Sequence, residues 1–321
     1  MRLSQKYLSR ISLFILFSVV TAWSQIDSTG IKLLEQRKYS EAQAFFELAV
    51  KKNTKDAEAY YQLSRTLLFQ RKNDDAQDAI EEAIDINEHV AKYHFMRGQV
   101  LGAKAMNANI FSQGILAPKI KNAFLRAVEL DPLNVEARSG LYNYYVQAPG
   151  IMGGSDEKAF EQANEIVKLN PYRGHFFFAD YYQRKKDFDS AEKEFKTAIA
   201  LEPKKTAAYK NLGYFYVGQK RYADAVEQFK KYVELDPNNP DSYDSYADAL
   251  KAAEQYDEAI AKYQYALFVD GKFSASIFSM AECYEKKGMK QKAKETYQWF
   301  LTLETKGKRA EQAQQKVKEL Q

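Results

Sequence analysis

Two strings near the middle of the chain have residue types that catalysis uses. Ser155–Lys158 has the spacing of a serine nucleophile with a lysine base, but the companion Ser-Asp-Asn and Lys-Thr-Gly strings are absent from the sequence. Gly150–Gly154 is glycine-rich, yet no Lys-Ser/Thr ending follows it, and Asp156 and Glu157 would repel a phosphate. We therefore interpret Ser155 as the N-cap of a helix.

Cysteine and histidine are too scarce to build a metal centre or a disulfide. The 321 residues include 1 Cys and 3 His. Cys283 has no triad partner and is interpreted as a small buried residue. His94 and His175 stand where equivalent segments have Tyr or Ile, which favours packing over metal binding. We expect no enzyme activity, cofactor or metal; an enzyme with an unrecognised site is the weakest alternative.

The charge balance argues against a nucleic-acid partner. The formal net charge is +4, but Arg2, Lys6 and Arg10 all lie in the first 24 residues, which contain no acid. The remainder of the chain has 44 basic against 43 acidic residues. Because a nucleic-acid binder carries a clear basic excess, we expect no nucleic acid to bind.

The first 24 residues have the pattern of a secretory signal. Three basic residues precede Ile11–Trp23, an uncharged 13-residue apolar run. A membrane-spanning helix needs about 20 apolar residues, so this run is short for an anchor. The small residues Ala22 and Ser24 fit cleavage before Gln25. We expect a signal peptide at 1–24 and an exported, periplasmic or extracellular mature chain without a membrane span; the alternative is an uncleaved N-terminal anchor.

A 34-residue period organises the rest of the chain. It is marked by alanines at Ala42, Ala76, Ala191, Ala225, Ala259 and Ala293. In the unit of Ala225, a small residue precedes it by twelve places (Gly213), a large apolar residue follows by four (Phe229), and a proline follows by twelve (Pro237). Between the breakers, apolar residues recur at helical steps. The period therefore predicts stacked pairs of antiparallel helices.

The spacing resembles that of the tetratricopeptide repeat. The matching positions in one unit are Tyr209, Leu212, Gly213, Tyr216, Tyr222, Ala225, Phe229 and Pro237. The resemblance implies an all-α fold, an α-solenoid or right-handed superhelix of about eight helix-turn-helix units. The array 25–307 divides into units near 23–56, 57–90, 91–134, 135–171, 172–205, 206–239, 240–273 and 274–307. A polar-backed capping helix is expected at 308–321, because an end unit has no neighbour to cover its apolar side.

Two adjacent units exceed the period. We place the surplus at 104–118, between the helices of the third unit, and at 147–155 in the fourth. One interpretation is that both are tolerated surface loops. The other is that their apolar residues fold onto each other, which would shape one end of a groove or form a small-molecule pocket. The Ala-Pro and Gly-Gly pairs of Ala148–Gly154 resemble a stretch found in exported bacterial tetratricopeptide proteins of unassigned role.

The resemblance implies that the first helices line a concave surface that holds peptides or partner proteins. The residues predicted to face this groove are Tyr61, Arg65, Phe95, Gln99, Asn143, Phe176, Asp180, Lys210, Tyr214, Asp244 and Asp248. The aromatic ones have core packing as an alternative role. If exposed, Arg65 and Lys210 would favour acidic groups, and Asp244 with Asp248 basic ones.

A known carboxylate-binding variant of the repeat is not expected here. Lys210 and Asn211 are the nearest matches to its residues, but Tyr214 replaces the required Asn, and the later cations are missing. We therefore expect a non-catalytic scaffold for a peptide or partner protein of unknown identity. A small-molecule-binding protein is the alternative.

Overall fold

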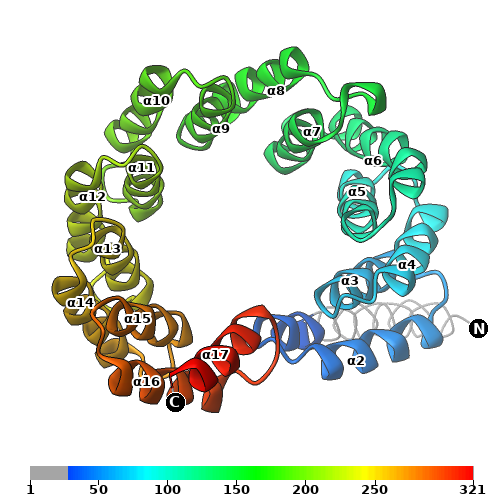
Figure 1. Ribbon diagram of the computed structural model, residues 1–321. Coiled ribbons are helices and arrows are strands. Elements are labelled where there is room, and N and C mark those ends of the chain that lie inside the picture. The colour runs from blue at the N-terminus through cyan, green and yellow to red at the C-terminus, as the bar shows by residue number, and fades with distance from the viewer. Residues whose placement is uncertain (1–27, 321) are drawn as a thin grey trace, which may run out of the picture. The chain divides into compact units, whose positions relative to one another are not determined.

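The computed structural model describes residues 28–320, and all its regular structure is helical within that range. The chain divides into two compact units, one ending at Leu169 and the other beginning at Asn170. Each unit is an α-solenoid of paired helices (Figure 1). The predicted signal peptide, its cleavage point and the first residues of the unit at 23–56 lie outside the described residues.

In the first unit, residues 28–35 are helical and precede three complete helix pairs. Its further helices are α2 (Tyr39–Lys52), α3 (Ala57–Phe69), α4 (Asn73–Ile86), α5 (Ala91–Met106), α6 (Ile110–Leu130), α7 (Val135–Gln147), the short 3-10 helix η1 (Gly150–Met152) and α8 (Asp156–Leu169). The helices α3, α5 and α7 pack against α4, α6 and α8, respectively.

The second unit contains four pairs and one additional helix. Its helices are α9 (Pro171–Arg184), α10 (Phe188–Leu201), α11 (Thr206–Gly218), α12 (Tyr222–Leu235), α13 (Pro240–Ala252), α14 (Tyr256–Val269), α15 (Ser274–Lys286), α16 (Lys290–Leu303) and α17 (Lys308–Glu319). Each odd-numbered helix from α9 to α15 packs against the helix that follows it. The all-α solenoid expected from the 34-residue period is confirmed.

Close approach of the two helices in a pair depends on a small residue facing a phenylalanine ring. A Cβ added to Gly213 on α11 would lie 2.6 Å from Cζ of Phe229 on α12. The same relation holds in the first unit, where a Cβ on Gly98 would lie 2.5 Å from Cε1 of Phe124. Phe229 is fully buried as a result. The small residue twelve places before the repeat alanine is therefore required by packing, as its spacing predicts.

One backbone geometry recurs in the turns within the pairs. A residue with positive φ occupies the same place in six of them: Arg37, Arg71, Lys186, Lys220, Glu254 and Gly288. The pairs α5–α6 and α7–α8 are joined differently, and these are the two units that exceed the 34-residue period. The additional residues therefore replace the tight left-handed turn.

The surplus of the third unit is helical rather than a loop, which corrects the placement of 104–118 between two helices. Helix α5 continues to Met106, and α6 begins at Ile110 and runs for 21 residues with Pro118 inside it. Asn109 caps α6, since its side chain accepts a hydrogen bond of 3.0 Å from the Ser112 amide. Only 107–109 connects the two helices.

The surplus of the fourth unit forms η1 and a constrained turn. Gly153 has a φ of 93°, and a Cβ on Gly154 would lie 1.8 Å from the carbonyl oxygen of Ala148. Tyr144 donates a hydrogen bond to the carbonyl oxygen of Met152. Ser155 accepts one of 3.3 Å from the Lys158 amide, so its predicted role as a helix N-cap is confirmed.

Helix α17 closes the second unit as the predicted cap. Its Ala310 and Ala313 are buried in a cluster with Tyr297 and Phe300 of α16. The opposite face is polar, and Nζ of Lys316 lies 2.6 Å from a carboxylate oxygen of Glu285 on α15. The cap therefore covers apolar rings that would otherwise contact water.

Replacing Ala313 by glutamate should destabilise the protein by about 2–4 kcal/mol, because a carboxylate would enter a packed apolar contact. Gln314 is the matched control, since it is exposed on the next position of the same helix. Its replacement by glutamate should change stability by less than about 0.5 kcal/mol. Urea unfolding followed by circular dichroism measures both; equal midpoints would contradict the packing role of α17.

Candidate protein-binding surface

The first helices of the pairs form the concave side of each unit. In the second unit α11 contacts α13, and α13 contacts α15; in the first unit α3 contacts α5, and α5 contacts α7. In the described chain, no comparable contact joins α10 with α12 or α12 with α14. Helices that approach each other mark the inner side of a curved layer, and Figure 1 shows this arrangement within each unit.

In the first unit, Tyr61 lies at the centre of an aromatic and cationic group. Its ring centroid is 5.4 Å from that of Tyr93. Nζ of Lys92 lies 4.9 Å from the Tyr61 ring centroid, and the Arg65 guanidinium carbon lies 5.7 Å from it. Burial raises the pKa of Tyr61, while Arg65 and Lys92 lower it. Tyr61 and Arg65 are thus brought together, as a half-buried pair on α3.

The other predicted residues of the first unit differ in exposure. Phe95 is half-buried on α5, and its ring centroid lies 5.9 Å from that of Phe124. Gln99 and Asn143 are exposed on α5 and α7. Phe95 therefore contributes mainly to packing between the helices of its pair, whereas Gln99 and Asn143 are open to solvent.

On α9, Phe176 and Asp180 are held by neighbours within the second unit. The Phe176 ring packs edge-on against Tyr172 at 5.1 Å between centroids and against Phe195 at 6.2 Å. Asp180 pairs with Arg184 one turn later at 2.7 Å. Phe176 is half-buried, so its aromatic packing role is the larger one.

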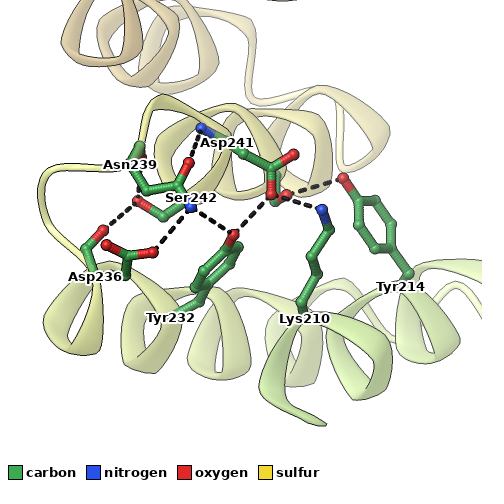
Figure 2. Close-up of polar contacts among 8 residues, drawn as sticks. Lys210, Tyr214, Tyr232, Asp236, Asn239, Asp241 and Ser242 are labelled. Atoms are coloured by element: carbon green, nitrogen blue, oxygen red, sulfur yellow. Dashed lines mark hydrogen bonds and ion pairs between the residues drawn. The ribbon is translucent and has the colours of Figure 1, made fainter. Parts of the chain in front are cut away.

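A polar network joins α11, α12 and α13 on the inner side of the second unit. Figure 2 shows Lys210 and Tyr232 pointing toward the same oxygen of Asp241, at 2.6 and 2.8 Å. Asn239 donates to the Tyr232 hydroxyl at 3.2 Å. Because its ammonium group is engaged by Asp241, Lys210 offers an external acidic group less charge than its sequence position predicts.

Tyr214 is the most exposed aromatic residue of this network, with 38% of its surface accessible. Its hydroxyl donates to the Ser245 hydroxyl at 2.9 Å, and its ring packs edge-on against Phe229 at 5.1 Å. Burial raises the pKa of Tyr214 to about 12. The ring is thus held by Phe229 and Ser245 while part of the residue remains open to solvent.

Asp244 and Asp248 lie one turn apart on α13. Asp244 is only 8% exposed and accepts a hydrogen bond of 2.6 Å from Ser276 on α15. Burial, with the nearby carboxylate of Asp248, raises the pKa of Asp244 to about 6. Asp248 is half-buried and accepts a hydrogen bond of 2.7 Å from Tyr263. Asp248 is therefore the more accessible carboxylate.

Sequence reasoning missed several partners in this network. Asp241 precedes Asp244 by three residues, and helical periodicity places residues three apart on the same face of a helix. Ser245 and Ser276 carry little sequence signal, because a serine on a helix gives no indication of which neighbouring helix it will bond. Their roles come from contacts between successive units.

Two of the histidines and the cysteine are held by neighbouring groups within the fold, whereas His89 is exposed. His94 is buried, and its Nε2 lies 2.7 Å from the Glu88 carbonyl oxygen. Nδ1 of His175 lies 2.5 Å from a carboxylate oxygen of Glu194. Cys283 is buried, and burial raises its pKa to about 12. Across residues 28–320, no three His, Cys, Asp or Glu side chains gather in a way that suits a metal ion, and no helix has the length and hydrophobicity to cross a membrane.

The fold and the inner surface define a class of protein, a solenoid built from tetratricopeptide repeats. Models of the tetratricopeptide repeat match residues 33–99, 178–240 and 229–261. The chain therefore contains tetratricopeptide repeats, as the spacing of its alanines and glycines indicates.

The chain is also similar to one curated protein and to solved structures, and the likeness to the first of these structures supports the fold. The BBSome complex member BBS4 of Bos taurus is 27% identical over 184 residues, which is 57% of this chain and 32% of that protein. This chain thus matches about a third of that relative's length. The crystal structure of yeast Tom70 is 16% identical, with a TM-score of 0.70 over 88% of this chain and 59% of that chain. The APC/C hetero-tetramer Cut9–Hcn1 is 13% identical, with a TM-score of 0.49 over 88% of this chain and 52% of that chain.

Proposed function

We propose that this protein is a non-catalytic scaffold that binds a peptide or partner protein on its first helices. The observation that carries the proposal is the inner face of α11 and α13, where a fixed, partly exposed aromatic ring lies near half-buried carboxylates. An aromatic anchor beside polar groups is typical of residues that dominate protein interfaces. The name of one relative, a BBSome complex member, supports a role in protein assembly.

The chemistry of this face favours a segment with both apolar and basic side chains. Tyr214 would contact an apolar side chain through its exposed part. Asp248 would accept hydrogen bonds from a Lys or Arg of the partner. Lys210 pairs with Asp241 at 2.6 Å, and Nζ of Lys251 lies 3.7 Å from Asp248. With Asp244, α13 thus places three aspartates beside two lysines.

Replacing Tyr214 by glutamate is expected to reduce recovery of the partner by about tenfold or more, because the interface would lose an aromatic anchor and gain a charge. The matched control is Tyr265, which lies on α14, the second helix of its pair, and is 54% exposed. Its replacement by glutamate should leave recovery unchanged. Affinity isolation from the native envelope fraction, with the recovered proteins identified by mass spectrometry, compares the three forms.

Two outcomes of this experiment would contradict binding on the first helices. If both substitutions reduce recovery equally, or if only the control does, the partner does not bind the first helices. Circular dichroism of each variant must match that of the original protein, so that a loss of binding is not a loss of folding. A small-molecule pocket at the two insertions has less support, because Phe111 is 83% exposed and Ile151 is 95% exposed.

We also propose that the chain is exported and acts outside the cytosol. The support is the basic and apolar pattern of residues 1–24, which precedes the first described helix. Cell fractionation followed by N-terminal sequencing tests it. A mature chain beginning at Gln25 is the expected outcome, and an intact N-terminus in the cytosolic fraction would contradict it.

A further inference from the structure

The two insertions of the first unit expose a group of large apolar side chains, here named the apolar tip. Its members and their exposed fractions are Met106 (85%), Ile110 (59%), Phe111 (83%), Ile115 (63%) and Ile151 (95%). Such a concentration of exposed apolar residues within a short stretch is unusual for a surface that contacts only water.

The tip is one surface built from two parts of the chain. Helix α6 contacts η1, and a Cβ on Gly114 would lie 3.8 Å from Cε of Met152. Ile151 is thereby held next to the first turns of α6. The Tyr144 hydroxyl fixes η1 by donating to the Met152 carbonyl oxygen. The apolar side chains are therefore presented on a constrained support.

The charge around the tip is basic. Residues 89–128 contain six Lys or Arg and no acid. Four of the six pair with acids from outside this stretch: Lys92 with Glu58, Arg97 with Glu81, Lys104 with Asp74, and Arg126 with Glu129. Lys119 is exposed and continues the helical row of Phe111 and Ile115 by one turn. Nζ of Lys121 would lie 3.6 Å from a Cβ on Gly153, close to η1.

Acidic residues resume at Glu129, at the far end of α6 from the tip, and the ones that lie nearest to η1 in sequence follow it. Asp156 and Glu157 are exposed in the first turn of α8, where they follow Ser155. On α6 itself the exposed apolar residues come first, Lys119 follows Ile115 by one turn, and Lys121 lies between the packed residues Ile120 and Phe124. An apolar end with lysines one turn behind it matches the depth profile of a bilayer surface, in which acyl chains lie beneath anionic headgroups.

We propose that the apolar tip inserts into the surface of an anionic phospholipid bilayer, with Lys119 and Lys121 at the headgroups. Individually projecting side chains suit a deformable lipid layer better than a flat protein face, which would need matching cavities. The proposal is independent of the binding function of the first helices, because it uses the insertions of α6 and η1 alone.

A local reporter tests insertion directly. Ile151→Cys in the full chain, labelled with the polarity-sensitive dye NBD, should show a blue shift and about a twofold or greater rise in fluorescence with phosphatidylglycerol vesicles, since the dye leaves water. The matched control is Phe268→Cys on α14, where the native side chain is 88% exposed. It should show no change. Cys283 is buried and stays unlabelled in the folded protein.

The pair of substitutions Phe111→Glu and Ile151→Glu should lower vesicle binding by about tenfold or more, because two carboxylates would face acyl chains and anionic lipid. Phe268→Glu is the control, and all forms share the same residues 1–27. Binding to phosphatidylcholine vesicles should be several-fold weaker than to phosphatidylglycerol vesicles.

Three results would overturn the proposal. One is an unchanged NBD signal at position 151 in protein that circular dichroism shows to be folded. Another is equal binding of the two lipids, which would remove the role of the lysines. The third is a blue shift without vesicles that rises with protein concentration, which would assign the tip to contact between two copies of the chain.

Discussion

Replacing Phe229 by alanine is expected to lower the free energy of unfolding by about 3–5 kcal/mol, the range for removing a buried aromatic ring. The ring is fully buried, and it fills the space that Gly213 leaves between α11 and α12. Because Gly213 has no side chain to extend into the cavity, the site should collapse little after truncation. Chemical denaturation followed by circular dichroism measures the change.

The control for this prediction is Phe268→Ala on α14, where the ring is 88% exposed. It should change stability by less than about 0.5 kcal/mol, because folding buries little of the Phe268 ring. A similar effect of both substitutions would contradict the pairing of Gly213 with Phe229. Because a repeat array need not unfold in one step, the comparison uses the transition midpoint of each variant.

The pairing of Gly213 and Phe229 shows why much of this fold follows from sequence. Both residues lie at fixed distances from Ala225, and the same spacing of a small and an aromatic residue recurs 34 residues earlier around Ala191 and 34 residues later around Ala259. Contacts within one helix pair are close in sequence, so a periodic pattern specifies them directly. The capping role of α17 follows in the same way, from the alternation of Ala310 and Ala313 with polar residues.

The third unit shows where the same reasoning fails. The excess over the 34-residue period is placed at 104–118, between the two helices of the unit, and Pro118 is a residue that ordinarily disrupts a helix. In the structure Pro118 lies inside α6, and Ala117 and Ile120 on either side of it are buried. Tertiary packing thus outweighs the lost amide donor. This balance depends on neighbouring helices and has no signature in the local sequence.

The sequence predicts which residues lie on the inner side of the solenoid better than it predicts how exposed their side chains are. The repeat pattern places Asp244 on the inner side, but it carries no information on the depth of a side chain between α13 and α15. Ser276, which bonds Asp244, is 32 residues away and belongs to the next unit. Whether a polar residue binds a partner or an adjacent helix is therefore decided by contacts between units.

Asp244→Asn is expected to stabilise the protein by roughly 1–3 kcal/mol near pH 7.5, and the gain should vanish near pH 4. Burial and the carboxylates of Asp248 and Asp241 raise the pKa of Asp244 to about 6, while Ser276 and Lys251 act in the opposite direction. The folded state therefore holds this proton more tightly than the unfolded state, whose aspartate titrates near pH 3.9.

The sign of the pH dependence follows from that difference. Protonated Asp244 favours the fold, so its contribution is full below about pH 4 and is lost as the pH rises through about 6. Asparagine remains neutral throughout and still accepts the hydrogen bond from Ser276. The variant should match the original protein in acid and exceed it at neutral pH, as measured by denaturation midpoints between pH 4 and 8.

Asp180→Asn on α9 is the control, because Asp180 is 42% exposed in its side chain and pairs with Arg184 at 2.7 Å. Losing this pair should cost less than about 1 kcal/mol and bring no gain at neutral pH. A gain in stability for Asp244→Asn that is independent of pH would show that the shape of the side chain, and not its charge, destabilises the original protein. A loss at every pH would show that the carboxylate is held by stronger donors than Ser276. The expected result is equal stability of the two forms near pH 4 and a more stable variant at neutral pH. It would establish Asp244 as a buried acid whose ionisation opposes folding.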